Sequence, residues 1–247
     1  MAGTSIEPSP LGRIVVPDDL LPGTALFWTT ADFDGRLTAE SVPALEEILV
    51  AFGLGGPIAT CDQVHGSTVN RLGAIADRWC EYSSCDALWT DTRPAALGIK
   101  AADCLPITII DPHNGVIANA HMGWRGAVAG VLGSLLGSLD DAEELSAMHA
   151  TAFLGPSIRR CCFEVGEEVI VAFEERYGNV DGLVDRDRGP RPFFDLPGLA
   201  RRLLLESGIQ AETTFDSELC TRCDGSIFHS YRRDGKNAGR NLAIVSQ

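Results

Sequence analysis

The feature of this chain that most constrains its fold is a pair of apolar runs, rich in β-branched residues, on either side of a turn sequence. Residues 105–111 read LPITIID, and residues 115–120 read GVIANA. The intervening Asp-Pro-His-Asn-Gly has Asp at its first position, Pro at its second and Gly at its close, which is typical of tight turns. The sequence therefore predicts an antiparallel hairpin.

Two potential metal ligands stand at the open end of this hairpin, because Cys104 precedes the first strand and His121 follows the second. If residues 111–114 form the turn, Ile110 faces Gly115 and Cys104 faces His121. Directly opposed residues have Cβ atoms about 4.5–5.5 Å apart, which suits two ligands of one zinc ion. A register slip of one residue would separate them, and a buried thiol beside a hydrogen-bonded core histidine is the alternative.

A third candidate ligand is His65, in the sequence Gln-Val-His-Gly at 63–66, just after an expected strand at 57–61. His65, Cys104 and His121 would form a site with two imidazoles and one thiolate. Three protein ligands leave the fourth tetrahedral position of zinc open, which is the pattern of catalytic rather than structural zinc sites.

The remaining cysteines include one Cys-x-x-Cys pair, Cys220 and Cys223, and the adjacent Cys161 and Cys162. A structural four-cysteine zinc site usually shows two Cys-x-x-Cys pairs, and only one is present here. We therefore interpret these residues as ordinary thiols.

A candidate anion site follows His121, where Met-Gly-Trp-Arg-Gly leads into an expected helix at 126–139. Glycines before a helix leave backbone N–H groups free to bind an anion, and Arg125 adds a positive charge. The alternative is a tight strand-to-helix turn with Arg125 in solvent. An anion pocket beside a metal ligand would suit hydrolysis, deamination or phosphorolysis.

The rest of the chain mixes helix and strand signals without an internal boundary, so we expect one α+β domain with mixed sheets over residues 1–247. Residues 1–22 are Pro-rich and unpatterned and are expected to form an irregular lead-in. Helical spacing or capping signals occur at 41–52, 126–139, 164–177 and 195–207, and strand-like runs occur at 24–30, 57–61, 86–90 and 151–154.

The charge balance restricts the partners, since 34 acidic and 20 basic residues give a net charge of −14. This balance argues against a nucleic-acid or anionic-membrane partner but permits a small anionic substrate held by arginines. The eight cysteines accompany no secretory signal, so we expect reduced thiols and a cytoplasmic protein. The apolar stretch 116–139 contains Asn119, His121 and Arg125 and is not expected to span a membrane.

Six ordered motifs resemble the laccase-domain, or polyphenol oxidase, family, whose members are also described as purine nucleoside phosphorylases. They are QVHG (63–66), CDALWT (85–90), ADCLPI (102–107), AHMGWRG (120–126), LGPSIRRCCFEVG (154–166) and FHSYRRDGKNAGRNLAIV (228–245). The similarity extends from about Ala25 to Val245, which is nearly the whole chain.

The resemblance implies a single four-layer α/β/β/α domain, related to cysteine hydrolases of the deamidating-toxin type. It implies a metal, zinc rather than copper, held by His65, Cys104 and His121. It also implies phosphorolysis of adenosine, inosine, guanosine and methylthioadenosine, and deamination of adenosine. The chain departs from the family where Trp28–Gly35 replaces a Ser-Thr-Arg-x-Gly-Gly segment, and it lacks a following Ser-Leu-Asn motif, which leaves its substrate preference open.

A multicopper oxidase is excluded by ligand supply, because the chain has only five histidines and a blue-copper centre alone takes two of them with a cysteine. The leading hypothesis is a zinc-dependent nucleoside enzyme that binds a nucleoside and phosphate as a monomer or small homo-oligomer. Candidate catalytic residues are Asp103, Cys104 and Arg125, with Asp103 either transferring a proton or orienting a ligand. Candidate substrate-binding residues are Gln63, Cys162 and Arg232.

Two other functions remain open at this point. In the first, Cys104 is the nucleophile and His121 the base of a hydrolase or amidase acting on peptidoglycan precursors. In the second, the chain is a non-catalytic zinc-binding protein.

Overall fold

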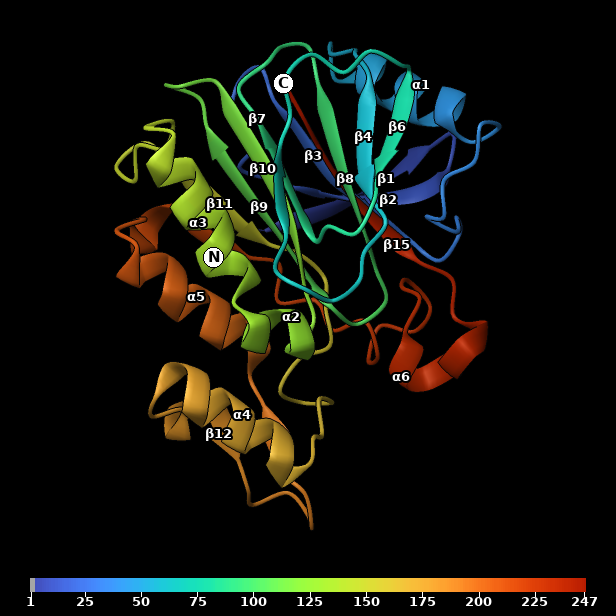
Figure 1. The fold of residues 1–247 in the computed structure, drawn as a ribbon. Coiled ribbons are helices and arrows are strands. Elements are labelled where there is room, and N and C mark those ends of the chain that lie inside the picture. The colour runs from blue at the N-terminus through green and yellow to red at the C-terminus, as the bar shows by residue number, and fades with distance from the viewer. Residues whose placement is uncertain (1–2) are drawn as a thin grey trace.

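Two mixed β-sheets form the centre of the protein in the computed structural model, which describes residues 3–247 (Figure 1). The seven-stranded sheet has the order β1 (Thr4–Ser9), β2 (Gly12–Pro17), β3 (Ala25–Thr29), β15 (Asn241–Ser246), β8 (Ala96–Ala101), β4 (Ile58–Cys61) and β6 (Trp79–Tyr82). The six-stranded sheet has the order β14 (Thr214–Asp216), β11 (Thr151–Leu154), β9 (Leu105–Asp111), β10 (Val116–Met122), β7 (Ala87–Thr90) and β5 (Val69–Arg71). A short separate pair consists of β12 (Val184–Asp185) and β13 (Phe193–Phe194).

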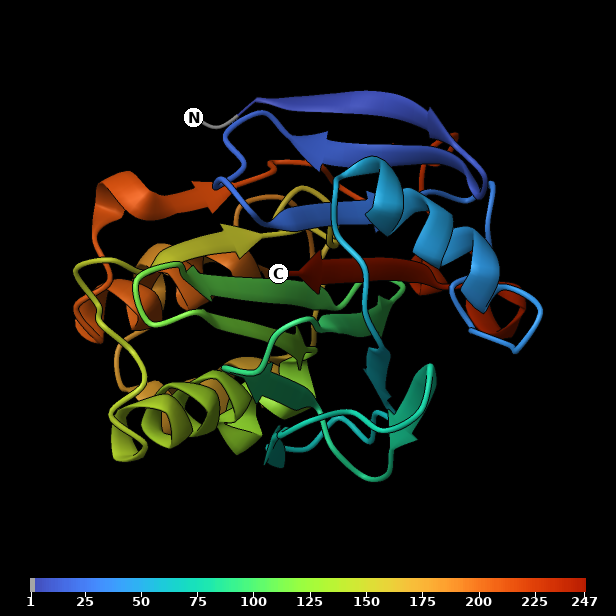
Figure 2. The same ribbon diagram turned by 90° about the horizontal axis from the view of Figure 1, so that it is seen from above.

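The helices cover the outer faces of the two sheets and one end of them (Figure 1, Figure 2). They are α1 (Val42–Ala51), α2 (Trp124–Ala129), α3 (Val131–Asp141), α4 (Glu167–Tyr177), α5 (Leu196–Glu206) and α6 (Tyr231–Asp234), with 3₁₀ turns η1 (Asp181–Leu183), η2 (Ala211–Thr213) and η3 (Gly235–Asn237). Helix α1 lies on the seven-stranded sheet, whereas α3 and α5 lie on the six-stranded sheet.

Three apolar layers separate these elements. Leu45 and Leu49 of α1 pack with Phe27 of β3, the two sheets meet through residues such as Leu26 and Ile117, and α3 and α5 pack on the far face of the six-stranded sheet. Each fully buried side chain of this size stabilises the fold by roughly 1.5–3 kcal/mol. The sheet-rich mixed α+β fold agrees with the fold class that the sequence predicts.

The expectation of an irregular lead-in at residues 1–22 is wrong for residues 3–22, because β1 and β2 form an antiparallel hairpin there; residues 1 and 2 lie outside the described part of the chain. Pro10 and Leu11 form the turn, Gly12 begins β2 with φ of +85°, and Ile14 to Val16 are buried where β2 pairs with β3. Pro8 lies in β1, which is the edge strand of the sheet, and an edge strand tolerates proline.

The central hairpin is present, but the predicted register is wrong by two residues, since Ile110 pairs with Ile117 and Leu105 with Met122. The turn is longer because an oxygen of Asp111 accepts hydrogen bonds from the backbone N–H groups of His113 and Asn114. Side chains in strands alternate with a period of two, so a shift of two residues preserves the face on which each side chain lies.

The helix predicted at 126–139 is divided into α2 and α3 by Gly130, which adopts a left-handed conformation with φ of +88°. The predictions at 164–177 and 195–207 correspond to α4 and α5. Asp195 caps α5 by accepting a 3.0 Å hydrogen bond from the backbone N–H of Gly198. The sequence predicts Ser41 as the N-cap of the helix at 41–52, but its hydroxyl bonds to the backbone of Thr38 instead of capping α1.

Candidate metal centre

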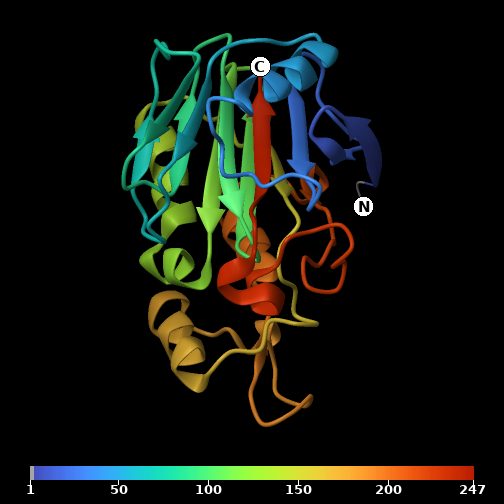
Figure 3. The ribbon, with the colours of Figure 1, turned by 90° about the vertical axis from the view of Figure 1, so that its right-hand side faces the viewer.

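The three predicted metal ligands meet in one cluster. Helices α2 and α6 lie at one end of the sheets (Figure 3), and residues of both helices line the same cleft as the three ligands. Cys104 directly precedes β9, His121 lies in β10, and His65 lies in the loop between β4 and β5. Their ligand atoms lie within 4.8 Å of one another, and Cys104 Sγ is 3.9 Å from His65 Nε2. Ligands of one tetrahedral zinc ion are separated by about 3.6 Å, so only small movements would complete the coordination.

Gly123 explains why the pair meets although Cys104 and His121 are not directly opposed. In the observed register Gly123 follows Met122, the partner of Leu105, and so lies across from Cys104. A Cβ atom at Gly123 would lie 2.7 Å from Cys104 Sγ and 3.2 Å from His65 Cδ2. The missing side chain therefore leaves the space that the cysteine and the diagonally placed histidine use.

Asp86 holds two of the ligands in place and was not identified from the sequence. Its fully buried carboxylate accepts a 2.9 Å hydrogen bond from His121 Nδ1, which leaves Nε2 of that ring for a metal. It also accepts hydrogen bonds from the successive backbone N–H groups of Val64, His65 and Gly66 at 2.7–3.2 Å. These bonds fix the loop in which His65 has φ of +60°. The sequence feature that could have identified it is that Asp86 is the acidic first residue of the otherwise apolar run at 86–90.

The side chains of Cys104 and His121 shift each other's protonation. Burial raises the pKa of the Cys104 thiol, but the positive charge of His121 and hydrogen bonds from His121 and His65 lower it to about 6. Burial lowers the pKa of His121, but the Cys104 thiolate and the Asp86 carboxylate raise it to about 9. Without a metal, the pair is therefore a thiolate beside an imidazolium near neutral pH.

A cleft of about 670 Å³ opens over the ligand cluster, and its volume is in the range of small-molecule sites. Apolar side chains form part of the wall, including Trp124, Ile158, Phe163 and Tyr231. In a chain with a net charge of −14, the cleft is nevertheless lined by five cationic residues, namely Arg36, Lys100, Arg125, Arg232 and Arg240. This local charge favours an anionic ligand.

Arg125 and Arg232 both line this cleft. The Arg125 guanidinium stacks over the Trp124 ring at 4.4 Å and, unlike Arg36, has no carboxylate partner among residues 3–247. Arg232 donates a hydrogen bond to the carbonyl of Glu164 and lies 5.7 Å from the centre of the Phe163 ring. The hypothesis of an anion site rests on the positive charge of Arg125 and not on the N-terminus of α2. Helix α2 is only six residues long, and Gly123 at its start faces the metal ligands.

Asp103 also lines the cleft, with a strained backbone and a carboxylate that is largely occupied. Its φ is +85°. Its two oxygens accept hydrogen bonds from the Thr221 hydroxyl at 2.6 Å and the Arg232 backbone N–H at 2.5 Å. Both bonds tie the residue before Cys104 to the C-terminal part of the chain. This arrangement favours the orienting role over the proton-transfer role.

Gln63 and Cys162 are less suited to the substrate-binding roles predicted for them. The Gln63 side chain lines the cleft, but its amide bonds both the carbonyl and the N–H of Lys100 at 2.7 and 2.9 Å. Cys162 is not among the cleft-lining residues that the structure describes. It lies instead with Cys161, Cys220 and Cys223 in a second thiol cluster, because the chain brings residues about 60 positions apart together.

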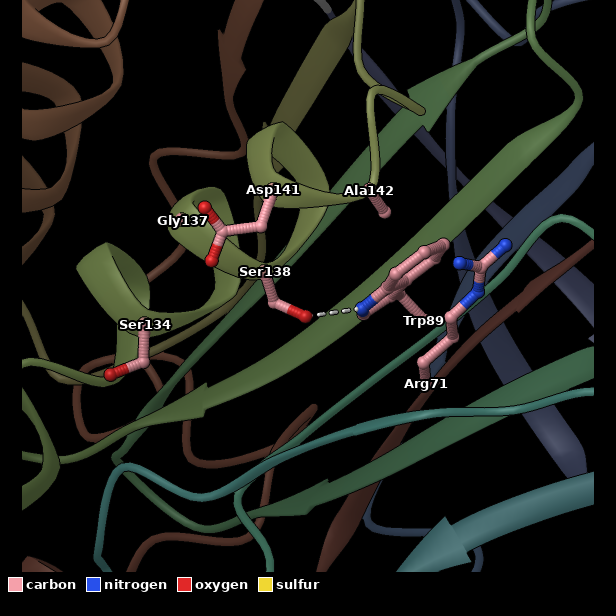
Figure 4. Close-up of a pocket in the computed structure, with 7 residues that line it drawn as sticks. All are labelled: Arg71, Trp89, Ser134, Gly137, Ser138, Asp141 and Ala142. Atoms are coloured by element: carbon pink, nitrogen blue, oxygen red, sulfur yellow. Dashed lines mark hydrogen bonds between the residues drawn. The ribbon is translucent and has the colours of Figure 1, made fainter.

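Another hollow, of about 560 Å³, lies between α3 and the β5–β7 edge of the six-stranded sheet (Figure 4). Some of its polar groups are already engaged, since Trp89 Nε1 donates to Ser138 at 2.9 Å and Arg71 pairs with Asp91 outside the hollow. Arg71 also lies over the Trp89 ring at 4.6 Å. We interpret this hollow as packing between a sheet edge and a helix.

The fold and the site together define a sheet-rich α+β protein with a His₂Cys ligand cluster in a cationic cleft. Residues 39–247 match the family described as multi-copper polyphenol oxidoreductase laccase. The chain belongs to this family.

Several curated relatives share substantial sequence with the chain. Adenosine deaminase RL5, from an unknown prokaryotic organism, is 36% identical over 166 residues, which cover 65% of this chain and 61% of that protein. Purine nucleoside phosphorylase of Xylella fastidiosa strain 9a5c is 34% identical over 74% of this chain and 69% of its own length. Purine nucleoside phosphorylase YlmD of Geobacillus stearothermophilus is 29% identical over 76% of this chain and 71% of its own length.

Solved structures share the fold. The crystal structure of YlmD from Geobacillus stearothermophilus superposes with a TM-score of 0.78 at 24% identity and covers 92% of both chains. That of Bacillus licheniformis hypothetical protein YfiH gives a TM-score of 0.81 at 21% identity over 97% of both chains. Of the helices between residues 3 and 247, none has the length and apolar character needed to span a bilayer.

Proposed function

We propose that this protein is a zinc-dependent purine nucleoside phosphorylase that accepts adenosine, inosine, guanosine and methylthioadenosine. The observation that carries the proposal is one cleft that combines a His₂Cys cluster with five cationic residues in an acidic protein. Relatives named as purine nucleoside phosphorylases support the reaction type. The relative named adenosine deaminase RL5 supports an accompanying deamination of adenosine.

The donor set fits a zinc ion, since a thiolate and two imidazoles are common ligands of catalytic zinc. The open side of the trio faces the cleft, and the space left by Gly123 permits the ligands to approach one another. A zinc ion held by His65, Cys104 and His121 would supply a Lewis acid next to the bound nucleoside. Asp86 orients the His121 ring through Nδ1, and Asp103 fixes the backbone that carries Cys104.

Phosphate is expected to bind near Arg125, whose guanidinium has no competing carboxylate partner in the part of the chain that the structure describes. An oxygen of hydrogenphosphate attacks C1′ of the ribose while the C1′–N9 bond breaks and its electron pair leaves with the purine. The proton of hydrogenphosphate passes to the departing base, so charge and atoms balance. Arg125 and Arg232 would offset the phosphate charge throughout, and Phe163 and Trp124 offer apolar surface to the purine.

The family's N-terminal arginine is absent from Trp28–Gly35, but the next residue, Arg36, brings a cation to the cleft. Arg36 lines the cleft and is held there by Asp34 and by a 2.8 Å hydrogen bond to the carbonyl of Ala238. We propose that Arg36 supplies part of the positive charge that the missing arginine would provide.

The test is to purify the protein without a metal-affinity tag, measure its metal content, and assay adenosine with and without phosphate. We expect adenine and ribose 1-phosphate to form only when phosphate is present. The Cys104→Ser variant should lose this activity by more than about 100-fold, because removing a ligand costs more than the 10–100-fold typical of residues that orient one. Cys80→Ser, a change outside both thiol clusters, should leave it unchanged. Phosphate-independent turnover would contradict the proposal.

A second candidate function is favoured by one observation, the chain of contacts from Cys104 through His121 to Asp86. In the metal-free protein this is a thiolate, an imidazolium and an orienting carboxylate, the arrangement of cysteine hydrolases. An amidase acting on peptidoglycan precursors would use Cys104 as nucleophile and His121 as base. Amide hydrolysis by metal-free protein, abolished by alkylation of Cys104, would favour this function over phosphorolysis.

We further propose that residues 1–247 form a single domain with the four-layer α/β/β/α arrangement of the deamidating-toxin type hydrolases. The three apolar layers described above support this arrangement. A cytoplasmic location and a monomeric or small homo-oligomeric state are part of the same proposal, and size-exclusion chromatography with light scattering tests the latter.

A further inference from the structure

Four cysteines that do not line the cleft form a compact group of their own. The sulfur atoms of Cys161, Cys162, Cys220 and Cys223 all lie within 4.8 Å of one another. Cys223 Sγ is 3.6 Å from Cys161 Sγ and 3.3 Å from Cys162 Sγ. Two loops contain these cysteines, one after β11 and one after β14.

These separations suit a single metal ion. A zinc ion with four thiolates at about 2.3 Å places its sulfurs about 3.8 Å apart in a tetrahedron. The observed distances are close to this value and well beyond the roughly 2.05 Å of a disulfide bond. A cluster of several iron atoms would place its thiolates on different metals, and therefore farther apart.

Hydrogen-bond donors and positive charges surround the group. The backbone N–H groups of Cys223, Arg159 and Arg222 face the sulfur of Cys220. Backbone donors that point at a thiolate stabilise its negative charge. Arg188 and Arg233 add positive charge nearby, because their guanidinium groups donate hydrogen bonds to the carbonyls of Cys161 and Thr221.

Protein ligands would fill all four coordination positions here, which is the pattern of a structural site. Cys162 and Cys220 are 8% and 5% exposed, whereas Cys161 and Cys223 lie at the surface. A metal could therefore enter from the exposed side and bind the buried pair behind it. We propose that Cys161, Cys162, Cys220 and Cys223 bind one structural zinc ion, separate from the ion proposed for His65, Cys104 and His121.

This second site has a direct connection to the cleft. Thr221, the first residue between the two cysteines of the Cys-x-x-Cys pair, is fully buried and donates the 2.6 Å hydrogen bond to Asp103. Asp103 precedes Cys104, and Phe163, which follows Cys162, lines the cleft. A zinc ion that joins the two loops would hold both of these groups in position.

The experiment measures zinc per chain in tag-free, reduced protein by elemental analysis. We expect two zinc ions in the wild type and in Cys80→Ser, and one in the double variant Cys161→Ser/Cys223→Ser. The double variant His65→Ala/Cys104→Ser should also retain one. After cobalt substitution, that variant should show the intense visible bands and the thiolate-to-cobalt charge-transfer absorption of a four-thiolate site.

Several outcomes would overturn the proposal. One zinc in the wild type together with none in His65→Ala/Cys104→Ser would show that the cysteine group binds no metal. A disulfide between Cys223 and Cys161 or Cys162 in freshly reduced and repurified protein would have the same meaning. If the serine double variant does not fold, stepwise release of two zinc ions from the wild type by a thiol-reactive mercurial supports the site, and release of only one contradicts it. None of these readouts depends on the catalytic activity.

The role in stability is tested by thermal unfolding. We expect Cys161→Ser/Cys223→Ser to lower the midpoint by at least about 5 °C, since a lost interaction of one kcal/mol already costs about 2–4 °C in a protein of this size. Cys80→Ser should shift it by less than the difference between replicate measurements. Equal midpoints for the two variants would exclude a structural role for the ion.

Discussion

The two clusters of candidate metal ligands contain similar atoms, but we propose opposite roles for them. The first, His65, Cys104 and His121, presents three ligands on one side of a cleft and has no fourth protein ligand in the described chain. The second, Cys161, Cys162, Cys220 and Cys223, presents four ligands and lines no part of that cleft. In our proposals, the number of ligands and the access to them, rather than the presence of thiols, distinguish the reactive centre from the structural one.

The groups that surround the two clusters also differ. Behind the first cluster stands the buried carboxylate of Asp86, which orients one histidine and binds the loop of another. Around the second cluster, backbone N–H groups face one sulfur. Because one side chain supports two ligands of the first cluster, a single substitution can perturb it, so the first cluster is the easier of the two to perturb selectively.

We expect the largest difference in zinc binding between the two clusters from Asp86→Asn. The amide retains one accepting oxygen, but its NH₂ group would face backbone N–H groups that the carboxylate now binds. We expect zinc affinity at the first cluster and catalytic activity to fall by about 10–100-fold, with no change in zinc at the cysteine cluster. Metal-competition titration measures the affinity. Asp91→Asn, at a partly exposed ion pair beyond the end of β7, is the matched control, and equal losses in the two variants would refute the role of Asp86.

A somewhat smaller effect is expected from Gly123→Ala. The new methyl group would lie 2.7 Å from Cys104 Sγ and 3.2 Å from His65 Cδ2, so the ligands must move apart. We expect roughly a 10-fold loss of zinc affinity and activity, as for a perturbed ligand orientation. Gly133→Ala in α3 is the control, because no neighbouring atom lies within 4 Å of the position that its methyl group would take and alanine favours a helix. Unchanged zinc binding in Gly123→Ala would show that the cluster tolerates the methyl group.

The third prediction concerns alkylation of metal-free protein by iodoacetamide as a function of pH. Because the Cys104 pKa is lowered to about 6 from its usual value of 9.0, its thiolate forms as the pH rises through about 6, and its alkylation rate should level off above that. Burial and the neighbouring thiols raise the pKa of Cys161, so this exposed residue should react only at alkaline pH. Peptide mapping by mass spectrometry measures both rates.

The same experiment on His121→Ala tests the cause of the shift. Loss of the imidazolium charge should move the Cys104 midpoint upward, towards the usual value for a thiol, and leave Cys161 unchanged. Identical Cys104 midpoints in the wild type and the variant would remove the electrostatic explanation.

The smallest effect on the metals is expected from Thr221→Val, which removes only the link between the clusters. The variant keeps all seven ligands but leaves one buried oxygen of Asp103 without its 2.6 Å hydrogen bond. We expect a loss of about 1–3 kcal/mol in the free energy of unfolding, a reduced kcat, and unchanged zinc at both clusters. Denaturant unfolding and elemental analysis measure these quantities. Ser134→Ala, at an exposed position of α3, serves as the control, and a kcat equal to the wild type would mean that Asp103 holds its position without Thr221.

The sequence alone predicted the features that depend on residues close together in the chain. The apolar runs around Asp-Pro-His-Asn-Gly predicted the β9–β10 hairpin, and the apolar faces and caps predicted α4 and α5. The trio of His65, Cys104 and His121 was also found, although the register used to derive it was wrong. The trio is still assembled because the error was two residues, which equals the period of a strand.

Tertiary structure decided everything that depends on residues far apart in the chain. The segment at 4–17 forms strands because β2 can pair with β3 and bury Ile14, Val15 and Val16. Asp86 became the orienting carboxylate because β7 pairs with β10 and places it beside His121. The four cysteines form one group because two loops about 60 residues apart converge. Local patterns specify the turns, caps and alternating faces, whereas convergence of distant groups is fixed only when the sheets and helices pack and bury their apolar faces together.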